Sequence, residues 1–555
     1  MAKVTSYNVS RYLLHRLYQL GSKHLFVVCG DFLLGFLDQV LASDVKLINC
    51  CNELNAGYAA DGYARLNGLC AVATTYAVGE LSALNAIAGA YAEYVPVVKI
   101  AGAPDMSHQL AGRMLHHTLG DYAIPRDIYR KVTVACEFIT SAANAPEQID
   151  QALAKCLYYK RPVYFELPAN LVTQKCDTPA EFKFINEPSH PQMLQEALQE
   201  ATAMLTHAKQ PIVLLGLEIF RHGLQTQVQA LLEKAGLPYC TLTTGKSLLS
   251  EDHPQFVGCY KGNWSRDYVK NTVEQSDCIL MLGCFFTDFD TGGFTSRLDP
   301  EKLIRANFEQ LTVKYHMFPR INLTEFIEKL KDQLPSKKFN DSIISAKARF
   351  AQNTKAFEPE QKAKLTVKRF FERVSSFFKP NDIIIAEVGE AIFSLASCLL
   401  PKNATFINQT FYSSIGYTVG ATLGACLAQP ERRVILFVGD GSFQLTAQEI
   451  STMLRYNVKP TIFLLNNAGY AIERAIHDGP YNDLQPWRYH LLPQALGGNA
   501  GLDVHTEDEL EKALVTAEKH TQLTFIEIHT DKFDFGDTMR QAGAALAESS
   551  KHSYE

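Results

Sequence analysis

Short apolar segments recur along the whole chain between stretches that have the hydrophobic period of amphipathic helices. Nine of these segments, each five to seven residues long, show no alternation between apolar and polar positions. Strands with that pattern are buried on both faces, as in parallel sheets covered by helices. We therefore expect an α/β fold of mainly parallel sheets flanked by helices. The predicted strands are residues 25–29, 70–75, 95–101, 211–216, 278–283, 383–387, 434–439, 461–466 and 524–528.

Two polar stretches divide this pattern into three parts. Residues 177–192 are rich in proline and charge, and residues 335–364 contain few large apolar side chains. Such stretches are typical of linkers, and a chain of 555 residues is too long for one hydrophobic core. We predict three domains, at residues 1–180, 190–340 and 360–555. Because ligands bind beyond the carboxyl ends of parallel strands, functional residues should directly follow the predicted strands.

Composition and charge argue against several classes of partner. With a formal net charge of -6 and both signs interspersed, the chain has no basic stripe for a nucleic acid. No segment has the roughly 18 uncharged apolar residues of a membrane span, and the N-terminus has the pattern of an amphipathic helix rather than a signal peptide. The 13 cysteines include no C-x-x-C pair, so neither a disulfide framework nor a zinc site is expected. We expect a cytoplasmic protein that acts on a small molecule.

The clearest chemical signal is a GDG motif followed by an NN motif, each directly after a predicted strand. Asp440 offers a carboxylate oxygen and Asn467, 27 residues later, an amide oxygen, while Gly439 and Gly441 let a ligand approach the backbone closely. Mg²⁺ takes few protein oxygens and commonly shares phosphate oxygens; a helix starting near Ser442 would direct amide groups at that charge. The pair of motifs predicts a site for Mg²⁺ and a diphosphate. Taken alone, GDG is as compatible with a tight turn as with this site, and the alternative for NN is a solvated loop.

With these two motifs the chain resembles the thiamine-diphosphate enzyme superfamily, in which GDG is followed by NN after about 25 residues. The resemblance implies thiamine diphosphate and Mg²⁺ as cofactors. It assigns the metal to the side chains of Asp440 and Asn467 and to the backbone carbonyl of Gly469. The further cofactor contacts that it implies are Val388, Gly439, Gly441, Ser442, Tyr470 and Ile472.

Glu53 is the candidate for the carboxyl group that this cofactor chemistry requires. It opens a helical pattern rich in small residues, where a glutamate that stabilises a helix N-terminus is the alternative. The segments NELNAGYAADGYAR, TTYAVGELSALNAIAGAYAE and LHHTLGD follow one another as in the pyruvate and indolepyruvate decarboxylase family, which the chain resembles from about residue 24 to about residue 530. That resemblance implies decarboxylation of 2-oxo acids to an aldehyde and carbon dioxide. It also implies a homodimer in which Glu53 acts across the subunit interface, with a homotetramer as a common assembly.

Four further ionisable residues have the chemistry needed to move protons during decarboxylation. Asp31 follows a predicted strand, His116 and His117 are adjacent, and Glu473 lies six residues beyond Asn467. The resemblance assigns all four to proton transfer and to positioning. Taken singly, an aspartate after a strand is most often a turn residue, and a histidine pair is more often one buried and one solvated ring.

Other positions follow from the same resemblance. Ile415 corresponds to an apolar wedge that bends the cofactor, and the carbonyl of Ser413 to the acceptor for the cofactor's amino group. Two departures stand out: residues 28–31 read VCGD where many relatives have VPGD, and no cysteine occurs from 215 to 223. Fungal relatives have an activating cysteine in the similar stretch of the middle domain. Activation by substrate through such a cysteine is therefore unexpected here.

The predicted substrate pocket is wide. At positions where pyruvate-restricted bacterial relatives have tryptophan, this chain has Ile392 and Ala542. Smaller walls should admit larger side chains, so aromatic or branched 2-oxo acids such as indolepyruvate and phenylpyruvate are expected substrates. The remaining apolar wall is predicted to be Phe289, Val388, Ile472 and Ile476.

Two other functions remain open at this point. A carboligase of the acetohydroxyacid synthase type shares the fold, the cofactor and Glu53, but usually lacks the histidine pair and the Glu473 position. A non-catalytic paralogue that only binds the cofactor is disfavoured because every expected acid and base is present. A dinucleotide-binding enzyme is less compatible, since no G-x-G-x-x-G follows a strand.

Overall fold

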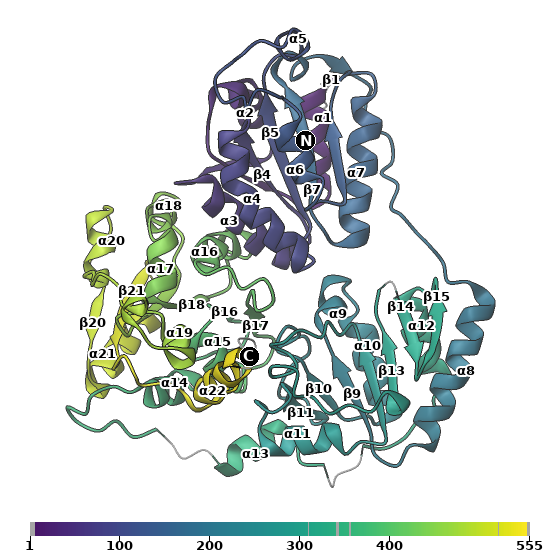
Figure 1. Cartoon of the computed structure of the whole chain (residues 1–555), viewed down its shortest axis with the longest axis vertical. Coiled ribbons are helices and arrows are strands. Elements are labelled where there is room, and N and C mark those ends of the chain that lie inside the picture. Colours follow the sequence, from purple (N-terminus) through teal and green to yellow (C-terminus); the bar gives the residue numbers. More distant parts are fainter. Residues whose placement is uncertain (1–5, 309, 340–342, 354–356, 520, 552–555) are drawn as a thin grey trace.

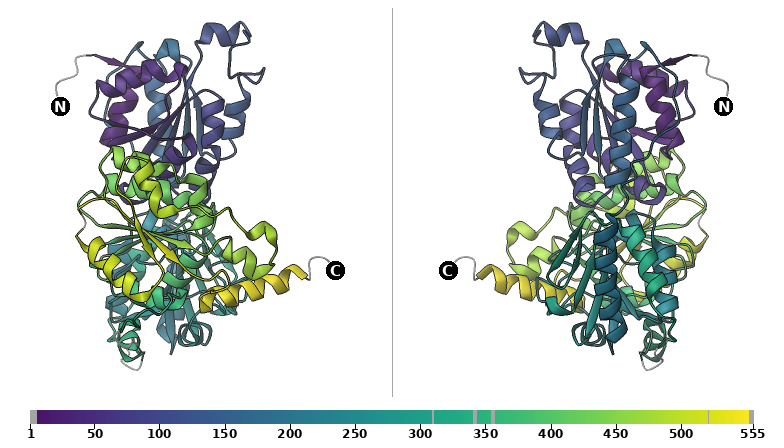
Figure 2. Two further views of the ribbon diagram at one scale, coloured as in Figure 1. Left: turned by 90° about the vertical axis from the view of Figure 1, so that its left-hand side faces the viewer. Right: turned by 90° about the vertical axis from the view of Figure 1, so that its right-hand side faces the viewer.

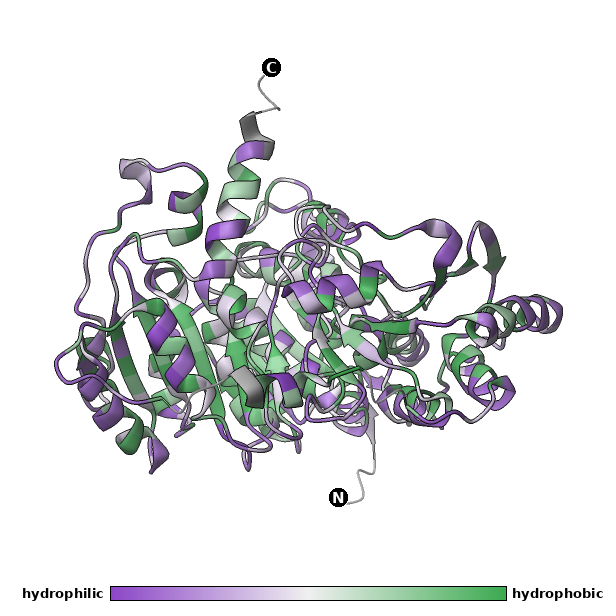
Figure 3. Ribbon diagram, turned by 90° about the horizontal axis from the view of Figure 1, so that it is seen from below, coloured by the Kyte–Doolittle hydropathy of each residue, from purple (hydrophilic) through white to green (hydrophobic). Residues whose placement is uncertain are grey.

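The structure is a computed structural model that describes residues 6–551 except 309, 340–342, 354–356 and 520. It contains three large α/β sheets, one in each third of the chain (Figure 1). The apolar strands lie inside, and the hydrophilic residues gather on the helices around them (Figure 3). The expected fold class is therefore confirmed.

The N-terminal sheet has six parallel strands in the order β3-β2-β4-β5-β7-β6. A short antiparallel pair, β1 (Tyr7–Asn8) and β8 (Lys175–Cys176), lies apart from it. The strands are β2 (His24–Val27), β3 (Lys46–Asn49), β4 (Cys70–Thr75), β5 (Val97–Ala103), β6 (Ala135–Phe138) and β7 (Val163–Pro168). The helices are α1 (Val9–Gln19), α2 (Leu34–Leu41), α3 (Glu53–Asn67), α4 (Val78–Ala92), α5 (Met106–Leu110), α6 (Ile124–Tyr129) and α7 (Ala145–Tyr159).

The middle sheet has seven strands in the order β11-β10-β9-β12-β13-β14-β15, of which the last two run antiparallel to their neighbours. The strands are β9 (Pro211–Leu215), β10 (Tyr239–Thr241), β11 (Phe256–Cys259), β12 (Cys278–Leu282), β13 (Leu303–Ala306), β14 (Gln310–Val313) and β15 (His316–Pro319). The helices are α8 (Pro191–His207), α9 (Leu217–Arg221), α10 (Gln225–Ala235), α11 (Asp267–Glu274) and α12 (Leu323–Gln333). Helix α13 (Ala346–Asn353) follows in the stretch that leads to the third sheet.

The C-terminal sheet has six parallel strands in the order β17-β16-β18-β19-β21-β20. The strands are β16 (Ile383–Ala386), β17 (Thr405–Ile407), β18 (Val434–Gly439), β19 (Thr461–Asn466), β20 (Leu502–Val504) and β21 (Thr524–His529). The helices are α14 (Val367–Ser375), α15 (Glu390–Leu395), α16 (Tyr417–Ala428), α17 (Asp440–Thr446), α18 (Glu449–Arg455), α19 (Ala471–Ile476), α20 (Leu492–Ala495), α21 (Glu507–Glu518) and α22 (Asp537–Lys551).

All nine predicted strands form, within two residues at either end. The stretch 335–364, predicted to be a linker, contains the helix α13, and its residues 340–342 and 354–356 lie outside the described part. The last segment of the chain, which the sequence did not place, forms α22. This helix packs against α15 and α19, and its far end projects from the molecule (Figure 2).

Helices α3 and α16 pack against each other and join the N-terminal and C-terminal sheets of one chain (Figure 1). Small residues permit a very close approach: a Cβ atom at Gly424 would lie 2.0 Å from the carbonyl oxygen of Ala59. Buried polar groups fix the contact, because the Tyr417 hydroxyl donates to Asp61 at 2.5 Å and Asp61 also pairs with Arg65 at 2.6 Å. The small-residue pattern that begins at Glu53 therefore builds a helix contact.

Among the described residues, no helix combines the length and the apolar character needed to cross a bilayer. All 13 cysteines are free thiols, and seven of them are buried.

Candidate active site

The GDG and NN motifs lie side by side at the carboxyl ends of two adjacent parallel strands, β18 and β19. Asp440 is the first residue of α17, and its side chain is 1% exposed. Its two carboxylate oxygens accept backbone N–H groups of Gly441 at 2.8 Å and Gly469 at 3.2 Å. Burial raises the pKa of Asp440 to about 7 despite these bonds. A cation beside this carboxylate would offset that cost of burial.

Asn467 supplies the second side-chain oxygen expected for the metal. Its residue is 8% exposed, and its Oδ1 atom is buried without a hydrogen-bond partner in the described part of the chain. A buried amide oxygen without a partner is costly, by about 1 to 3 kcal/mol, unless a ligand satisfies it. Oxygen ligands of this kind are those that Mg²⁺ prefers. The residues present therefore fit a magnesium ion.

The backbone around these two side chains leaves room for a diphosphate. A Cβ atom at Gly439 would meet nothing within 4 Å. Gly469 is the opposite case, since a Cβ atom there would lie 2.1 Å from the carbonyl oxygen of Asn482, so only glycine fits. Ser442 is buried in α17, and Tyr470 is half-buried at the start of α19.

Glu387 holds the segment that carries Ser413 and Ile415, and the sequence analysis missed it. This buried carboxylate accepts the Thr418 hydroxyl at 2.7 Å and the Gly416 N–H at 3.1 Å. Ser413 has a φ of 55°, and Ile415 is half-buried, so its side chain is partly open for contact. The only available signal was an acid at the end of the predicted strand IIIAE. An acidic residue there usually indicates where a strand ends.

Glu53 is the first residue of α3, after the cap at Asn52, whose side chain accepts the N–H of Asn55 at 2.8 Å. The Glu53 side chain is half-buried and lies beside Gly79, whose Cβ position would be 3.1 Å from a carboxylate oxygen. Within the described part of the chain, no hydrogen bond or ion pair joins Glu53 to Asp440 or Asn467. In the described part of one chain, the predicted base therefore makes neither kind of direct contact with the predicted metal residues.

Asp31, His116 and His117 meet although 85 residues separate the first two. Nε2 of His116 lies 2.7 Å from Oδ2 of Asp31, and the three residues each place a ligand-type atom within 4.8 Å of the others. The His116 ring stacks on Phe32 with a centroid distance of 4.9 Å, and His117 adopts a φ of 71°. A carboxylate that orients one imidazole beside a second is an arrangement suited to proton transfer.

The remaining predicted residues cluster around α15, α19 and α22. Glu473 is exposed on α19, and no hydrogen bond in the described part of the chain links it to the Asp31–His116 pair. Ile392 and Ala542 are fully buried in one hydrophobic cluster, with Phe289 and Ile472 packed at its edge. Ile476 and Val388 are half-buried. The structure thus places most of the predicted pocket wall in one region. Two of its residues, Ile392 and Ala542, are buried in the hydrophobic core there.

Comparison with known protein families matches three models in chain order. Residues 7–123 match the N-terminal thiamine pyrophosphate binding domain of thiamine pyrophosphate enzymes, residues 198–334 match the central domain, and residues 387–528 match the C-terminal thiamine pyrophosphate binding domain. Together the three models cover more than half of the chain. These enzymes bind thiamine diphosphate with a divalent metal ion, typically Mg²⁺, which agrees with the oxygen groups of Asp440 and Asn467.

Curated relatives match almost the whole length. The pyruvate decarboxylase of Aspergillus fumigatus is 37% identical over 98% of both chains. The pyruvate decarboxylase isozyme 2 of Saccharomyces cerevisiae is 34% identical over 99% of this chain and 100% of its own. The alpha-keto-acid decarboxylase of Mycobacterium leprae is 37% identical over 95% and 94%. From the site geometry and these matches, the chain belongs to the family of thiamine-diphosphate-dependent 2-oxo acid decarboxylases.

Proposed function

We propose that this protein decarboxylates pyruvate and bulkier 2-oxo acids to aldehydes and carbon dioxide, in the cytoplasm. The observation that carries the proposal is the buried pair of Asp440 and the partnerless Asn467 oxygen beside an open glycine turn. Relatives whose names state pyruvate or alpha-keto-acid decarboxylation support the reaction class.

The protein residues divide the work between holding and proton transfer. Asp440, Asn467 and the Gly469 carbonyl would hold the metal, and thiamine diphosphate, when bound, would supply an electron sink for decarboxylation. The segment held by Glu387 presents Ser413 and Ile415 to that cofactor. Asp31 orients His116 through the contact at 2.7 Å, so that the imidazole can hold or release a proton beside the substrate. Glu473 is a further group able to exchange a proton, in addition to Glu53, Asp31 and the two histidines.

We further propose that two copies of the chain complete each site. Glu53 has no hydrogen bond or ion pair with the metal residues of its own chain in the described part of the structure. In the decarboxylase family that the chain resembles, the corresponding glutamate acts across a subunit interface. A homodimer is then the smallest active unit, and a homotetramer is the assembly we expect.

The preference for bulkier substrates rests on the residues near α15 and α22. The predicted wall residues Ile392 and Ala542 are smaller than tryptophan and lie in a buried cluster, and Phe289 and Ile472 pack against it. Accommodating an aromatic ring in an apolar pocket contributes on the order of 2 kcal/mol of selectivity. Comparing kcat/KM for phenylpyruvate with that for pyruvate measures this preference. If kcat/KM for pyruvate exceeds that for phenylpyruvate by about 100-fold, the prediction of a wide pocket is wrong.

The reaction is tested with the Glu53→Gln variant. We expect carbon dioxide release to fall at least about 100-fold while thiamine diphosphate and Mg²⁺ still bind, because the diphosphate residues are unchanged. The matched control is Glu147→Gln, which alters an exposed glutamate in the first turn of α7. Undiminished turnover in Glu53→Gln rules out the proposed role.

Product analysis separates decarboxylation from ligation. With pyruvate as substrate, acetaldehyde supports the proposal, and acetolactate indicates a carboligase. If neither an aldehyde nor a ligation product forms from any of several 2-oxo acids, the protein only binds the cofactor.

A further inference from the structure

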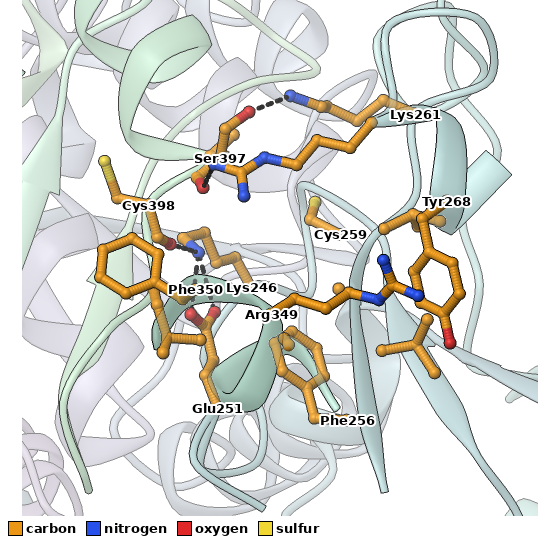
Figure 4. Close-up of a pocket in the computed structure, with 17 residues that line it drawn as sticks. Lys246, Glu251, Phe256, Cys259, Lys261, Tyr268, Arg349, Phe350, Ser397 and Cys398 are labelled. Atoms are coloured by element: carbon orange, nitrogen blue, oxygen red, sulfur yellow. Dashed lines mark hydrogen bonds and ion pairs between the residues drawn. The ribbon is translucent and has the colours of Figure 1, made fainter. Parts of the chain in front are cut away.

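A cavity of about 240 Å³ lies outside the candidate active site, between the middle domain and the segment that follows α15 (Figure 4). The middle domain contributes Lys246, Glu251, Cys259 and Lys261 to its wall. The C-terminal domain contributes Ser397 and Cys398, and α13 covers one side with Arg349. The cavity therefore lies where two domains meet.

The wall of this cavity carries more positive than negative charge. Lys246 is neutralised, because its Nζ lies 2.8 Å from a carboxylate oxygen of Glu251. Lys261 is not: it is 2% exposed, and its Nζ donates to the Ser397 hydroxyl at 3.1 Å. Arg266 donates to the Ser397 carbonyl at 3.0 Å. In the described part of the chain, neither Lys261 nor Arg266 has an ion pair with a carboxylate.

A buried ammonium group without a counter-ion is unfavourable. Such a group normally loses its proton or acquires an anion. Burial, together with the nearby charges of Lys246 and Arg266, lowers the pKa of Lys261 to about 8. One hydroxyl satisfies only one of its three donors. The space beside it is large enough for a small anion.

We propose that this cavity binds a small anion, a phosphate or a carboxylate group, that forms an ion pair with Lys261 and Arg266. Figure 4 shows Lys261 reaching across the cavity to Ser397, and Lys246 directed at Glu251 and at the Cys398 carbonyl. Arg349 lies over the ring of Tyr268 at one side of the cavity, with 3.1 Å between its Cζ atom and the ring centroid. An anion bound here would connect the middle domain to the C-terminal domain without touching the metal residues.

The chain contains an internal reporter for this site. Trp264 lies three residues after Lys261 and is 5% exposed. Its ring packs against Phe289 at 5.9 Å and against Phe393 of α15 at 5.8 Å between centroids. Trp487 is the second tryptophan, and it is 40% exposed. In a Trp487→Phe background the emission therefore comes from Trp264 alone.

The experiment titrates the holoenzyme, loaded with thiamine diphosphate and Mg²⁺, with inorganic phosphate and separately with acetate. Saturation of the diphosphate site prevents phosphate from binding there. The substrate pocket also accepts a carboxylate, so the Lys261 and Arg266 variants below separate binding in this cavity from binding in that pocket. We expect a saturable change in Trp264 emission and a rise in melting temperature with one of the two anions. The anion that saturates identifies the ligand as phosphate-like or carboxylate-like.

Lys261→Met and Arg266→Met should each weaken that binding by at least about tenfold, because each removes a charge-assisted hydrogen bond. The matched control is Lys270→Met on α11, outside the cavity, which should keep the affinity of the parent protein. Arg266 is exposed, so its variant tests the site even where Lys261→Met fails to fold. The proposal is overturned when neither anion saturates, or when Arg266→Met and every folded Lys261 variant bind as the parent does.

Discussion

At the scale of single residues, the site depends on polar atoms whose burial is costly in the protein alone. Asp440 is buried with a pKa raised to about 7, and the Asn467 oxygen is buried without a hydrogen-bond partner among the described residues. Neither feature contributes to a folded core, so each is understandable as half of an interaction with a ligand. This energetic cost of burying polar groups is confined to the carboxyl ends of β18 and β19.

Asn467→Ala should therefore weaken magnesium binding rather than unfold the protein. Removing the oxygen eliminates one metal ligand and also one costly buried group, so the apparent constant for activation by Mg²⁺ should rise at least about tenfold. Activity measured against added Mg²⁺ after treatment with a chelator gives that constant. Asn499→Ala, in an exposed loop, is the control. An unchanged Mg²⁺ requirement in Asn467→Ala means that this side chain is not a ligand.

Glu387 gives the stability of the protein a defined pH dependence. Burial raises its pKa from 4.5 to about 7, so the folded protein keeps a proton that the unfolded chain releases between these values. The stabilisation is complete below pH 4.5 and is lost as the pH rises through 7, by on the order of 3 kcal/mol in total.

In the Glu387→Gln variant the side chain at position 387 cannot titrate. The variant therefore does not lose this stabilisation as the pH rises. Thermal unfolding from pH 5 to pH 8 should show wild type losing stability relative to the variant as the pH rises, whereas Glu431→Gln, at an exposed site, should follow wild type. Parallel curves for wild type and Glu387→Gln would show that Glu387 stays ionised throughout.

Sequence reasoning reached Asp440 and Asn467 because both follow recognisable strands, and it reached Glu53 through the surrounding motif. It did not find Glu387, because the contacts of that carboxylate come from Gly416 and Thr418, about 30 residues later in the chain. A single acid at a strand end has no pattern that reveals such a partner. Long-range polar contacts of this kind are visible only once the fold is known.

At the scale of elements, the strands buried on both faces were predictable and the exposed or short ones were not. The nine apolar runs form strands because both faces of each are covered by helices. The antiparallel hairpin of β14 and β15 was missed, since each strand has only four residues and β15 is mostly exposed at the edge of the sheet. Helix α13 was also missed, because its polar composition resembles that of a linker.

The contact between α3 and α16 can be tested with Gly424→Ala. The added Cβ atom would lie 2.0 Å from the Ala59 carbonyl oxygen, so the helices must separate, at a cost of about 1 to 3 kcal/mol. The matched control is Gly35→Ala in α2. Its Cβ atom would meet only Val172, at 3.8 Å, and alanine favours the helix over glycine. Melting temperatures of the two variants should move in opposite directions. Equal melting temperatures contradict the close approach.

At the scale of the whole molecule, Glu53 and the predicted metal residues belong to different domains, with Glu53 at the start of α3 and Asp440 at the start of α17. Helix α3 packs on α16 of the same chain, while the Glu53 carboxylate lies beside Gly79 in the N-terminal domain. In the symmetric dimer that we propose, each copy presents its Glu53 to the cofactor held by the metal residues of the other. The two sites of such a dimer are then each made from two chains.

This arrangement predicts that two inactive variants restore each other. In a mixed dimer of Glu53→Gln and Asp440→Asn, one site combines both substitutions and the other combines the intact Glu53 of one chain with the intact Asp440 of its partner. Random assortment of equal amounts makes half of the dimers mixed, so co-expression should restore about one quarter of wild-type activity. Each variant expressed alone should stay near zero. A co-expressed sample no more active than the separate variants would show that each chain builds its site from its own residues, whatever its oligomeric state.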